Sequence, residues 1–156
     1  MMYQWFECKI KYEKTLEDGK VQKVTEPYLV DAINFTDAEK RIIEEIQPFM
    51  TGAFEVSDIK RVRYSELFED PRDEADRFYK AKVLFITLDE KSGAEKKTAN
   101  HMLIQAGTLR EALNRLEEGM ETTMIDYTVA SIQETSLIDV FHYKEAVSEG
   151  FKAVTE

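Results

Sequence analysis

The chain has 156 residues, which is long enough to bury a hydrophobic core without disulfides. Hydrophobic residues make up 43% and charged residues 33% of it, so the composition is that of a globular protein and excludes a disordered chain. The 31 acidic residues outnumber the 21 basic ones, and the net charge of −10 disfavours sequence-independent binding to duplex DNA, whose phosphates have the same sign.

The chain contains one cysteine, Cys8, so no internal disulfide is possible, which fits a reducing compartment. Cys8 alternates with Phe6 and Ile10, and we therefore expect a small buried side chain rather than a reactive thiol. The N-terminus lacks the layout of a signal peptide, and no apolar run reaches the roughly 20 residues that cross a bilayer. The expected location is the cytoplasm, without membrane contact.

Two strands are predicted at the start of the chain. Apolar and polar residues alternate over residues 3–14, which is typical of a strand with one buried face. The Asp18-Gly19 pair then indicates a turn, because glycine adopts a positive φ at little cost. The partner strand covers about residues 21–33. Pro27 has no N–H to donate, so this strand should lie at an edge or begin again at residue 28.

A helix and a long strand follow. Thr36 and Glu39 have the spacing of a capping box, in which each side chain accepts from the other residue's amide. The helix should end before Pro48, because the residue before a proline avoids the α region. A strand is predicted over residues 54–67, with a β-bulge near residues 57–58, where the apolar parity changes. The buried stripe of the helix should consist of Ala38, Ile42, Ile43 and Ile46.

The same order of elements then recurs. Residues 66–76 are acidic and lack periodicity, and we interpret them as a soluble connection. Strands are predicted over residues 78–89 and 97–106. Thr108 opens a helix that ends near Gly119, and residues 125–141 form the last strand. The buried stripe of this second helix should consist of Leu109, Ala112, Leu113 and Leu116.

The two halves of the chain match each other. At an offset of 73 residues, residues 54–59 align without a gap with residues 127–132, whereas the register drifts at the helices. The sequence therefore predicts an α+β fold made of tandem duplicated β-β-α-β units at residues 3–68 and 76–141. Each unit is small, so we expect the two to share one core, formed by a mainly antiparallel sheet and two helices. Whether the units form one sheet or two stays open.

This interpretation gives one domain over residues 1–143 and a C-terminal tail over residues 144–156. Few residues in it suggest chemistry. His101 and His142 lie in different units, without a cysteine or carboxylate at ligand spacing. The sequence contains neither a Gly-rich phosphate loop nor a nucleophile motif. We expect no enzymatic activity, no metal and no cofactor.

One pattern suggests binding. On the first strand of each unit, the face opposite the core should carry an aromatic residue followed by lysines, with further bases on the strand that closes the first unit. Such a face could stack and neutralise single-stranded nucleic acid. The alternative is a half-solvated sheet whose aromatic residues pack at a rim or subunit contact, and the acidic net charge favours this alternative. The candidate binding face consists of Trp5, Lys9, Lys11, Arg61, Arg63, Phe78, Lys80 and Lys82.

Several segments carry a family resemblance: Glu26-Pro27-Tyr28-Leu29-Val30-Asp31-Ala32, Phe35-Thr36-Asp37-Ala38-Glu39, Val56-Ser57-Asp58-Ile59-Lys60, Phe85-Ile86-Thr87-Leu88-Asp89-Glu90-Lys91-Ser92-Gly93 and Leu109-Arg110-Glu111-Ala112-Leu113. In this order they resemble a family of short proteins from Bacteroidetes and from their phages and mobile elements, classed as a domain of unknown function. The resemblance covers about residues 3–143. It implies a bacterial or phage setting and supplies no catalytic residues.

These observations lead to three functional hypotheses. The first is a non-catalytic binding or regulatory protein that contacts a protein partner or a second copy of itself. The second is an accessory protein that binds single-stranded nucleic acid. The third is a small-ligand sponge, for instance for a nucleotide, that acts in phage anti-defence. The sequence identifies neither the partner nor the oligomeric state, nor whether a host or a phage encodes the chain.

Overall fold

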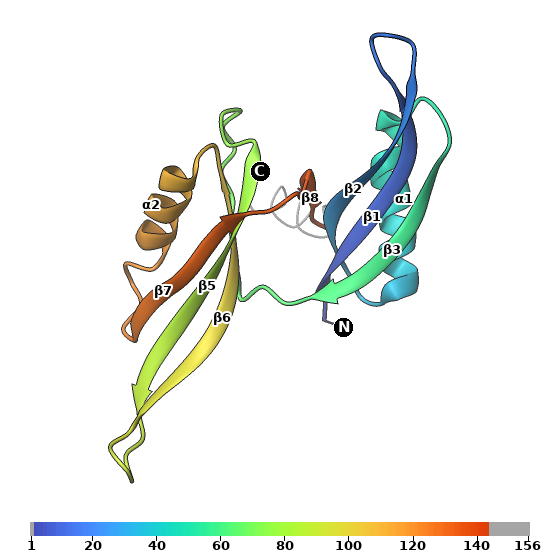
Figure 1. The fold of residues 1–156 in the computed structure, drawn as a ribbon. Coiled ribbons are helices and arrows are strands. Elements are labelled where there is room, and N and C mark those ends of the chain that lie inside the picture. Colours follow the sequence, from blue (N-terminus) through green and yellow to red (C-terminus); the bar gives the residue numbers. More distant parts are fainter. Residues whose placement is uncertain (1, 144–156) are drawn as a thin grey trace, which may run out of the picture. The chain divides into compact units, whose positions relative to one another are not determined.

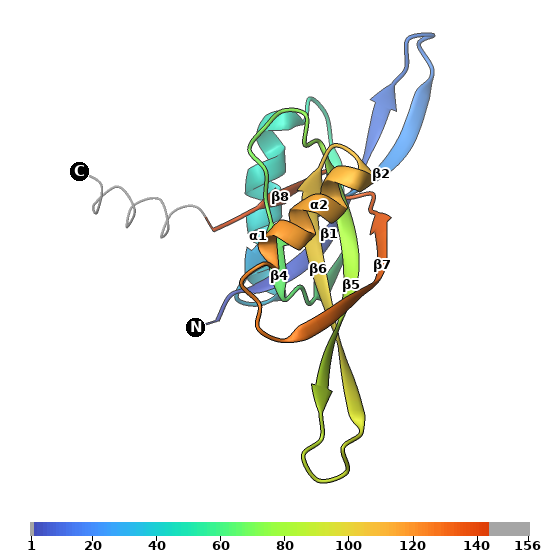
Figure 2. The same ribbon diagram turned by 90° about the vertical axis from the view of Figure 1, so that its left-hand side faces the viewer.

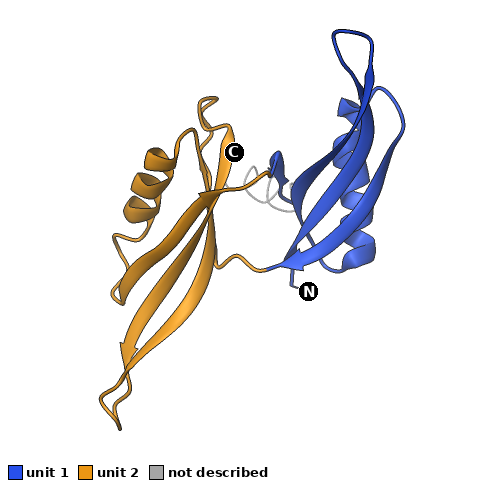
Figure 3. Ribbon diagram, in the orientation of Figure 1, with its two compact units in different colours: residues 1–62, 137–156 blue, residues 63–136 orange. Residues whose placement is uncertain are grey.

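A computed structural model of the chain describes residues 2–143. The chain divides into two compact units, which Figure 3 shows in different colours. Of the described residues, unit 1 contains 2–62 and 137–143, and unit 2 contains 63–136. Each unit contains one four-stranded sheet and one long helix, so the predicted α+β class is confirmed.

Unit 1 contains a sheet with the strand order β3-β1-β2-β8, and α1 covers one of its faces (Figure 1). The pairs β1–β2 and β1–β3 are antiparallel, whereas the short strand β8 runs parallel to β2. A 3-10 turn at Gln47–Phe49 follows the helix and accommodates Pro48 at its start, so the helix ends where the proline predicted. The elements are β1 (Gln4–Thr15), β2 (Val21–Ala32), α1 (Phe35–Ile46), β3 (Phe54–Val62) and β8 (Asp139–Phe141).

Unit 2 repeats this arrangement, with the strand order β4-β6-β5-β7 and α2 against one face (Figure 2). Strand β4 is parallel to β6, and the other pairs are antiparallel. The elements are β4 (Glu66–Phe68), β5 (Arg77–Leu88), β6 (Glu95–Ala106), α2 (Leu109–Gly119) and β7 (Asp126–Glu134).

The strand registers of the two units correspond residue by residue. In unit 1 the pairing of β1 with β3 shifts between Lys9 and Ile10, which leaves Ser57 as the extra residue and confirms the predicted bulge. In unit 2 the pairing of β5 with β7 shifts at the equivalent place, between Lys82 and Val83. The structure therefore contains two copies of one arrangement, and their origin by duplication stays a prediction.

The last strand of each predicted repeat belongs to the other unit. Residues 54–67 do not form one strand: β3 ends at Val62, and β4 pairs with β6 of unit 2. Residues 125–141 are divided in the same way, because β7 ends at Glu134 and β8 pairs with β2 of unit 1. The predicted repeats at 3–68 and 76–141 therefore exchange their final strands.

Each unit has a hydrophobic cluster of its own, where the sequence predicted a single shared core. The exchanged strand gives each sheet a fourth strand and adds Phe141 to the cluster of unit 1 and Phe68 to that of unit 2. In unit 1, Phe6, Ile10 and Ile42 are fully buried; in unit 2, Ile104 and Leu116 are fully buried. Each unit thus buries both a sheet face and a helix stripe, as an amphipathic helix on a sheet requires.

The helix caps were predicted in part. Thr108 caps α2, because its hydroxyl accepts from the Glu111 amide at 3.1 Å, and the Glu111 carboxylate accepts from the Gly107 amide. The N-cap of α1 is Asn34 and not Thr36: the Asn34 side chain accepts from the Asp37 amide at 2.8 Å. The Asp37 carboxylate in turn accepts from the amide of Ile33, so the reciprocal pattern of a capping box lies two residues earlier than predicted.

Only two of the four residues of the predicted α2 stripe are fully buried. Ala112 and Leu116 are fully buried, whereas Leu109 and Leu113 are 51% and 36% exposed. Gly119 belongs to α2 itself, and the C-cap is Met120. The reason for a glycine at position 119 is therefore a close approach: a Cβ atom there would overlap the ring of Phe68 on β4.

Candidate functional site

The first candidate is the helix-free face, meaning the side of each sheet opposite its helix. On β1 the side chains of Phe6, Cys8 and Ile10 pack toward α1, so the intervening residues lie on the helix-free face. Lys9 and Lys11 are exposed there. Trp5 is half-buried and contacts the His142 ring edge-on, with 5.2 Å between the ring centroids. The alternation of the sequence placed these three residues correctly.

The helix-free face of unit 1 carries both signs of charge in alternation. Lys9 lies directly opposite Asp58 of β3, and Lys11 lies opposite Glu55. Glu7 lies opposite Lys60 in the same ladder. Opposite charges at cross-strand positions attract each other and lower the local potential. This face is therefore not the basic stripe that a nucleic-acid backbone requires.

Arg61 does not belong to this face. It lies opposite Phe6, on the side of α1, and its guanidinium carbon is 5.7 Å from the centre of the Phe6 ring and 5.4 Å from that of Phe35. Neighbouring residues of a strand point to opposite sides, so Lys60 and Arg61 cannot share a face. Arg63 is exposed and follows the end of β3. The grouping of Arg61 with the lysines was wrong.

On the helix-free face of unit 2, the aromatic residue is buried, and the lysines have no acidic residue opposite them on the neighbouring strands. Phe78 is only 3% exposed, so it offers no ring for stacking. Lys80 is half-buried and lies opposite Gln133, and Lys82 is exposed and lies opposite Ser131. On its other side Lys82 faces His101 of β6. The lysines of this face are thus opposed by neutral side chains, in contrast to those of unit 1.

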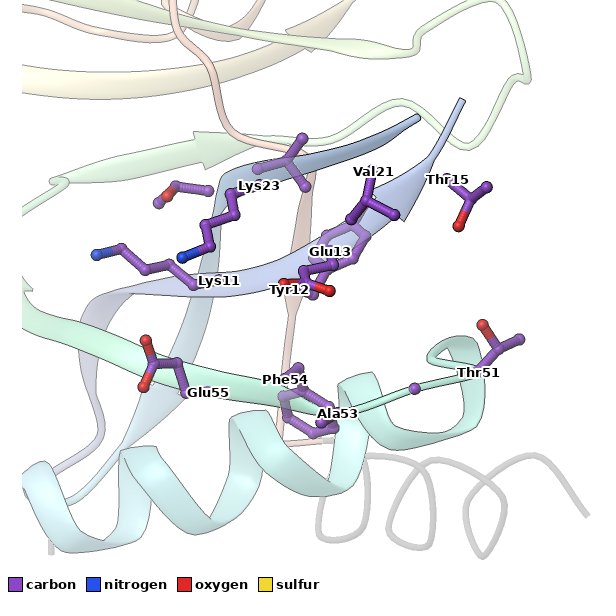
Figure 4. A pocket seen from close by; sticks show the side chains of 13 residues that line it. Lys11, Tyr12, Glu13, Thr15, Val21, Lys23, Thr51, Ala53, Phe54 and Glu55 are labelled. Carbon is purple, nitrogen blue, oxygen red and sulfur yellow. The ribbon is translucent and has the colours of Figure 1, made fainter. Parts of the chain in front are cut away.

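The second candidate is a groove of about 850 Å³ at the far end of the β1–β2 hairpin in unit 1 (Figure 4). Its volume is within the range of small-molecule sites. Lys11 and Lys23 extend into it, but Glu13 and Glu55 also line it, so its formal charges cancel. Tyr12, Val21, Val24 and Phe54 contribute its apolar part. A balanced lining gives no particular preference for a phosphate, and the nucleotide hypothesis stays a prediction.

A third feature went unnoticed in the sequence. The Asp70 carboxylate is 2% exposed and accepts hydrogen bonds from two arginines: Arg72 Nη2 at 2.7 Å and Arg115 Nη2 at 2.8 Å. The hydrogen bonds from Arg72 are the main cause that lowers the pKa of Asp70 to about 2. The side chain of Gln105 accepts from the Asp70 amide and donates to the carbonyl of Ala75. These contacts hold Asp70 and Ala75 within unit 2, so the segment is not a wholly solvated connection, although residues 71–74 are exposed.

Unit 1 has a related arrangement. Arg41 occupies the position on α1 that Arg115 occupies on α2, and it forms an ion pair with Asp31 at 3.2 Å. Its guanidinium also lies over the Tyr143 ring at 4.9 Å, and Tyr143 stacks on Tyr3. Burial raises the pKa of Asp31, and the charge of Arg41 opposes this shift. In both units, then, a helix arginine holds the segment that follows the exchanged strand.

Comparison with models of protein families gives a match over most of the chain. The model described as Domain of unknown function (DUF4494) matches residues 4–143. The chain belongs to this family. No curated protein matches the chain. The match covers both units and both exchanged strands, so DUF4494 describes the whole of this two-unit fold rather than one unit of it.

Large apolar side chains are exposed in the loop that follows the helix of each unit. Phe49, after α1, is 74% exposed. Met124 and Ile125, after α2, are 95% and 48% exposed. Single exposed apolar residues are common, but here each unit of the DUF4494 fold exposes at least one in the segment between its helix and the following strand, although not at equivalent positions.

Groups with metal-binding or nucleophilic chemistry are few. Within residues 2–143, no three His, Cys, Asp or Glu side chains come together so that they could hold a metal ion. Cys8 is fully buried, and this burial raises the pKa of its thiol to about 12. Neither helix of this part of the chain is long and apolar enough to span a membrane.

Proposed function

We propose that the protein is a non-catalytic binding or regulatory protein that acts by contacting other macromolecules, including a second copy of itself. In the setting that the family resemblance implies, it works in the cytoplasm of a bacterial host and belongs to the host, a phage or a mobile element. The observation that supports binding is the pair of exposed apolar loops.

The loops after α1 and α2 have the composition of a contact surface. Phe49 and Met124 are mostly exposed, and burying a side chain of this size against a partner contributes roughly 1.5–3 kcal/mol. Large aromatic and methionine side chains are enriched at interfaces for this reason. Because both units present them, a partner could contact either loop.

The test is affinity capture from a lysate of the bacterial host with four baits: the unmodified protein, Phe49→Ser, Met124→Ser and Leu88→Ser. Leu88 is 68% exposed at the tip of the β5–β6 hairpin and serves as the matched control. We expect a partner that the unmodified protein and Leu88→Ser recover equally and that the loop variants lose. Equal recovery by all four baits, or recovery by none, would contradict the proposal.

A second candidate function is single-stranded nucleic-acid binding by unit 2. It is supported by the lysines of β5, which face Gln133, Ser131 and His101 rather than acids. With Phe78 buried, binding would depend on the phosphate backbone and would therefore weaken steeply with salt.

Fluorescence anisotropy with a labelled single-stranded oligonucleotide at low salt tests this candidate. Lys82→Glu should abolish salt-dependent binding, whereas Lys9→Glu, at the equivalent position opposite Asp58, should leave it unchanged. Absence of salt-dependent binding, or equal loss in both variants, would rule the candidate out.

A further inference from the structure

Strand β3 forms the outer edge of the unit 1 sheet, as the order β3-β1-β2-β8 requires (Figure 1). It is nine residues long and pairs only with β1 within its sheet. An edge strand directs half of its backbone N–H and C=O groups away from the sheet, where another strand can bind them. Its residues Glu55, Asp58 and Lys60 are exposed.

The bulge at Ser57 determines how such a strand can be paired. Val56 and Ile59 are three positions apart, which in a regular strand would place them on opposite faces. Both pack toward α1 here, because the bulge adds one residue between them. Residues that face each other across two strands must point to the same side of the sheet. In two antiparallel copies of β3, the residues before the bulge of one copy lie opposite the residues after the bulge of the other. The side chains of these opposed residues point to the same side of the sheet when the two-fold axis passes between residues 57 and 58, or when it is displaced from there by whole residue steps. A displacement by half a residue step would instead oppose side chains that point to different sides.

In this central register the two strands are complementary. Glu55 faces Lys60 of the second copy, and by symmetry Lys60 faces its Glu55. On the other face, Val56 meets Ile59 of the second copy. Across the joined sheet this gives the row Lys11, Glu55, Lys60 and Glu7, in which every neighbour has the opposite sign. A shift that brings residue 55 opposite residue 58 would instead place two acids together, and like charges at such positions destabilise a pair.

The equivalent edge strand of unit 2 lacks this charge pattern. In the same register, Thr128 of β7 would face Gln133 of the second copy, and neither is charged. The charged residues of β7, Asp126 and Glu134, lie at its two ends, and Glu134 is 3.7 Å from Arg77 within the same unit. The two edges have the same bulge and length, so their difference is one of side-chain charge.

We propose that β3 pairs antiparallel with β3 of a second copy of this chain, about a two-fold axis between Ser57 and Asp58. This inference rests on the self-association included in the proposed function and names its surface. A bulge on an edge strand discourages indiscriminate pairing. Here the bulge allows only registers that differ by whole residue steps of the axis. Among these, the charges of Glu55 and Lys60 favour the central register.

Light scattering after size exclusion, over a wide range of protein concentrations, measures the dimer. Glu55→Lys and Lys60→Glu should each weaken it by about tenfold or more, because each dimer contains the pair twice. The double variant Glu55→Lys with Lys60→Glu restores opposite charges and should bind more tightly than either single variant. Thr128→Lys and Gln133→Glu on β7 serve as matched controls and should leave the dimer unchanged.

Circular dichroism and the melting temperature of each variant separate a loss of pairing from a loss of folding. A monomer at every concentration, or a dimer that the single charge reversals do not weaken, would overturn the inference. Equal weakening by the β7 variants would also overturn it. The capture experiment with Phe49→Ser and Met124→Ser is independent, so a partner found there with a monomeric protein would leave the proposed function standing.

Discussion

Asp70 is a buried acidic side chain of unit 2 that forms ion pairs with two arginines. Its carboxylate accepts from Arg72 and Arg115 while it is almost fully buried, and its pKa falls to about 2 from an ordinary value of 3.8. A carboxyl group with a lowered pKa in the folded state stabilises that state above its ordinary pKa and loses this effect as the pH falls toward the lowered one. The contribution is therefore complete at neutral pH and disappears between about pH 4 and 2.

Asp70→Asn should lower the melting temperature at neutral pH by several degrees, because it removes the charge from a site that two guanidinium groups surround. It should also flatten the decline of stability between about pH 4 and 2. Thermal melts across this pH range measure both effects. Asp73→Asn, at an exposed position of the same segment, is the control. Equal melting temperatures for Asp70→Asn and the control at neutral pH would refute the prediction.

Cys8 should be inert in the folded protein. It is fully buried, and burial raises the pKa of its thiol from 9.0 to about 12, so the reactive thiolate is scarce at neutral pH. We expect a thiol reagent to label the native protein far more slowly than the denatured one. If the native protein were labelled as fast as the denatured one, Cys8 would not be buried on β1 as described.

The same shift predicts a loss of stability in alkali. Above about pH 9 the unfolded thiol loses its proton while the folded one keeps it, so the unfolded state becomes relatively more stable as the pH rises toward 12. Burial of Tyr28 raises its pKa and acts in the same direction. Cys8→Ala should therefore show a shallower decline in melting temperature above about pH 9, with the contribution of Tyr28 remaining.

At the scale of elements, strand β4 depends on the missing side chain at position 119 of α2. A Cβ atom on Gly119 would overlap the Phe68 ring. Overpacking costs about 1–3 kcal/mol, whereas alanine in a helix gains about 1 kcal/mol over glycine. We expect Gly119→Ala to be destabilising by up to about 2 kcal/mol in denaturant unfolding.

Two further variants make this prediction specific. Gly52→Ala is the control, because a Cβ atom there would have no neighbour within 4 Å. Phe68→Leu should relieve the overlap, so the double variant Gly119→Ala with Phe68→Leu should lose less stability than the sum of the single variants. Additive losses would mean that the ring of Phe68 does not lie against the helix.

Local patterns in the sequence predicted the elements that depend on local interactions. The Asp18-Gly19 turn, the bulge at Ser57 and the Thr108 cap follow from residues a few positions apart, and the structure has all of them. The cap of α1 was placed at Thr36 because Thr36 and Glu39 have the right spacing, yet Asn34 and Asp37 have the same spacing and form the cap. Two overlapping local signals cannot be ranked without the structure.

Features that depend on distant contacts were not predictable. The strands β4 and β8 have three residues each, too few for a period, and their partner strands are chosen by tertiary packing. Arg115 is 45 residues away from Asp70, so no motif links them. For the candidate face, alternation placed Lys9, Lys11 and Lys82, but it could reveal neither the burial of Phe78 nor the acids opposite the unit 1 lysines.

At the scale of the whole molecule, the exchanged strands connect the two units of the chain. Each unit is completed by a strand that follows the other unit's third strand in sequence: β8 follows β7 and joins β2, and β4 follows β3 and joins β6. Phe141 of β8 is 6% exposed and stacks on Tyr28 at 5.8 Å in the core of unit 1. Phe68, at the same place in β4, packs on the core of unit 2.

Because the final strands are exchanged, replacing a phenylalanine of one predicted repeat should destabilise the unit that contains most of the other repeat. Phe141→Ala, which removes a ring from the core of unit 1, should cost about 3–5 kcal/mol and speed amide hydrogen exchange in β1, β2 and β3. Phe68→Ala removes a half-buried ring, so it should cost less, and its effect should appear in β5, β6 and β7. Mass spectrometry of peptides after hydrogen exchange separates the two units.

The repeat boundaries in the sequence would predict the opposite assignment, because Phe68 then belongs with residues 3–68 and Phe141 with residues 76–141. Val62→Ala, a half-buried change at the end of β3, is the control that keeps its effect within unit 1. If Phe68→Ala loosened β1 to β3, or if both variants loosened all strands equally, the strand exchange would be wrong. If the effects cross over as described, each unit depends for its stability on the strand that the other repeat supplies.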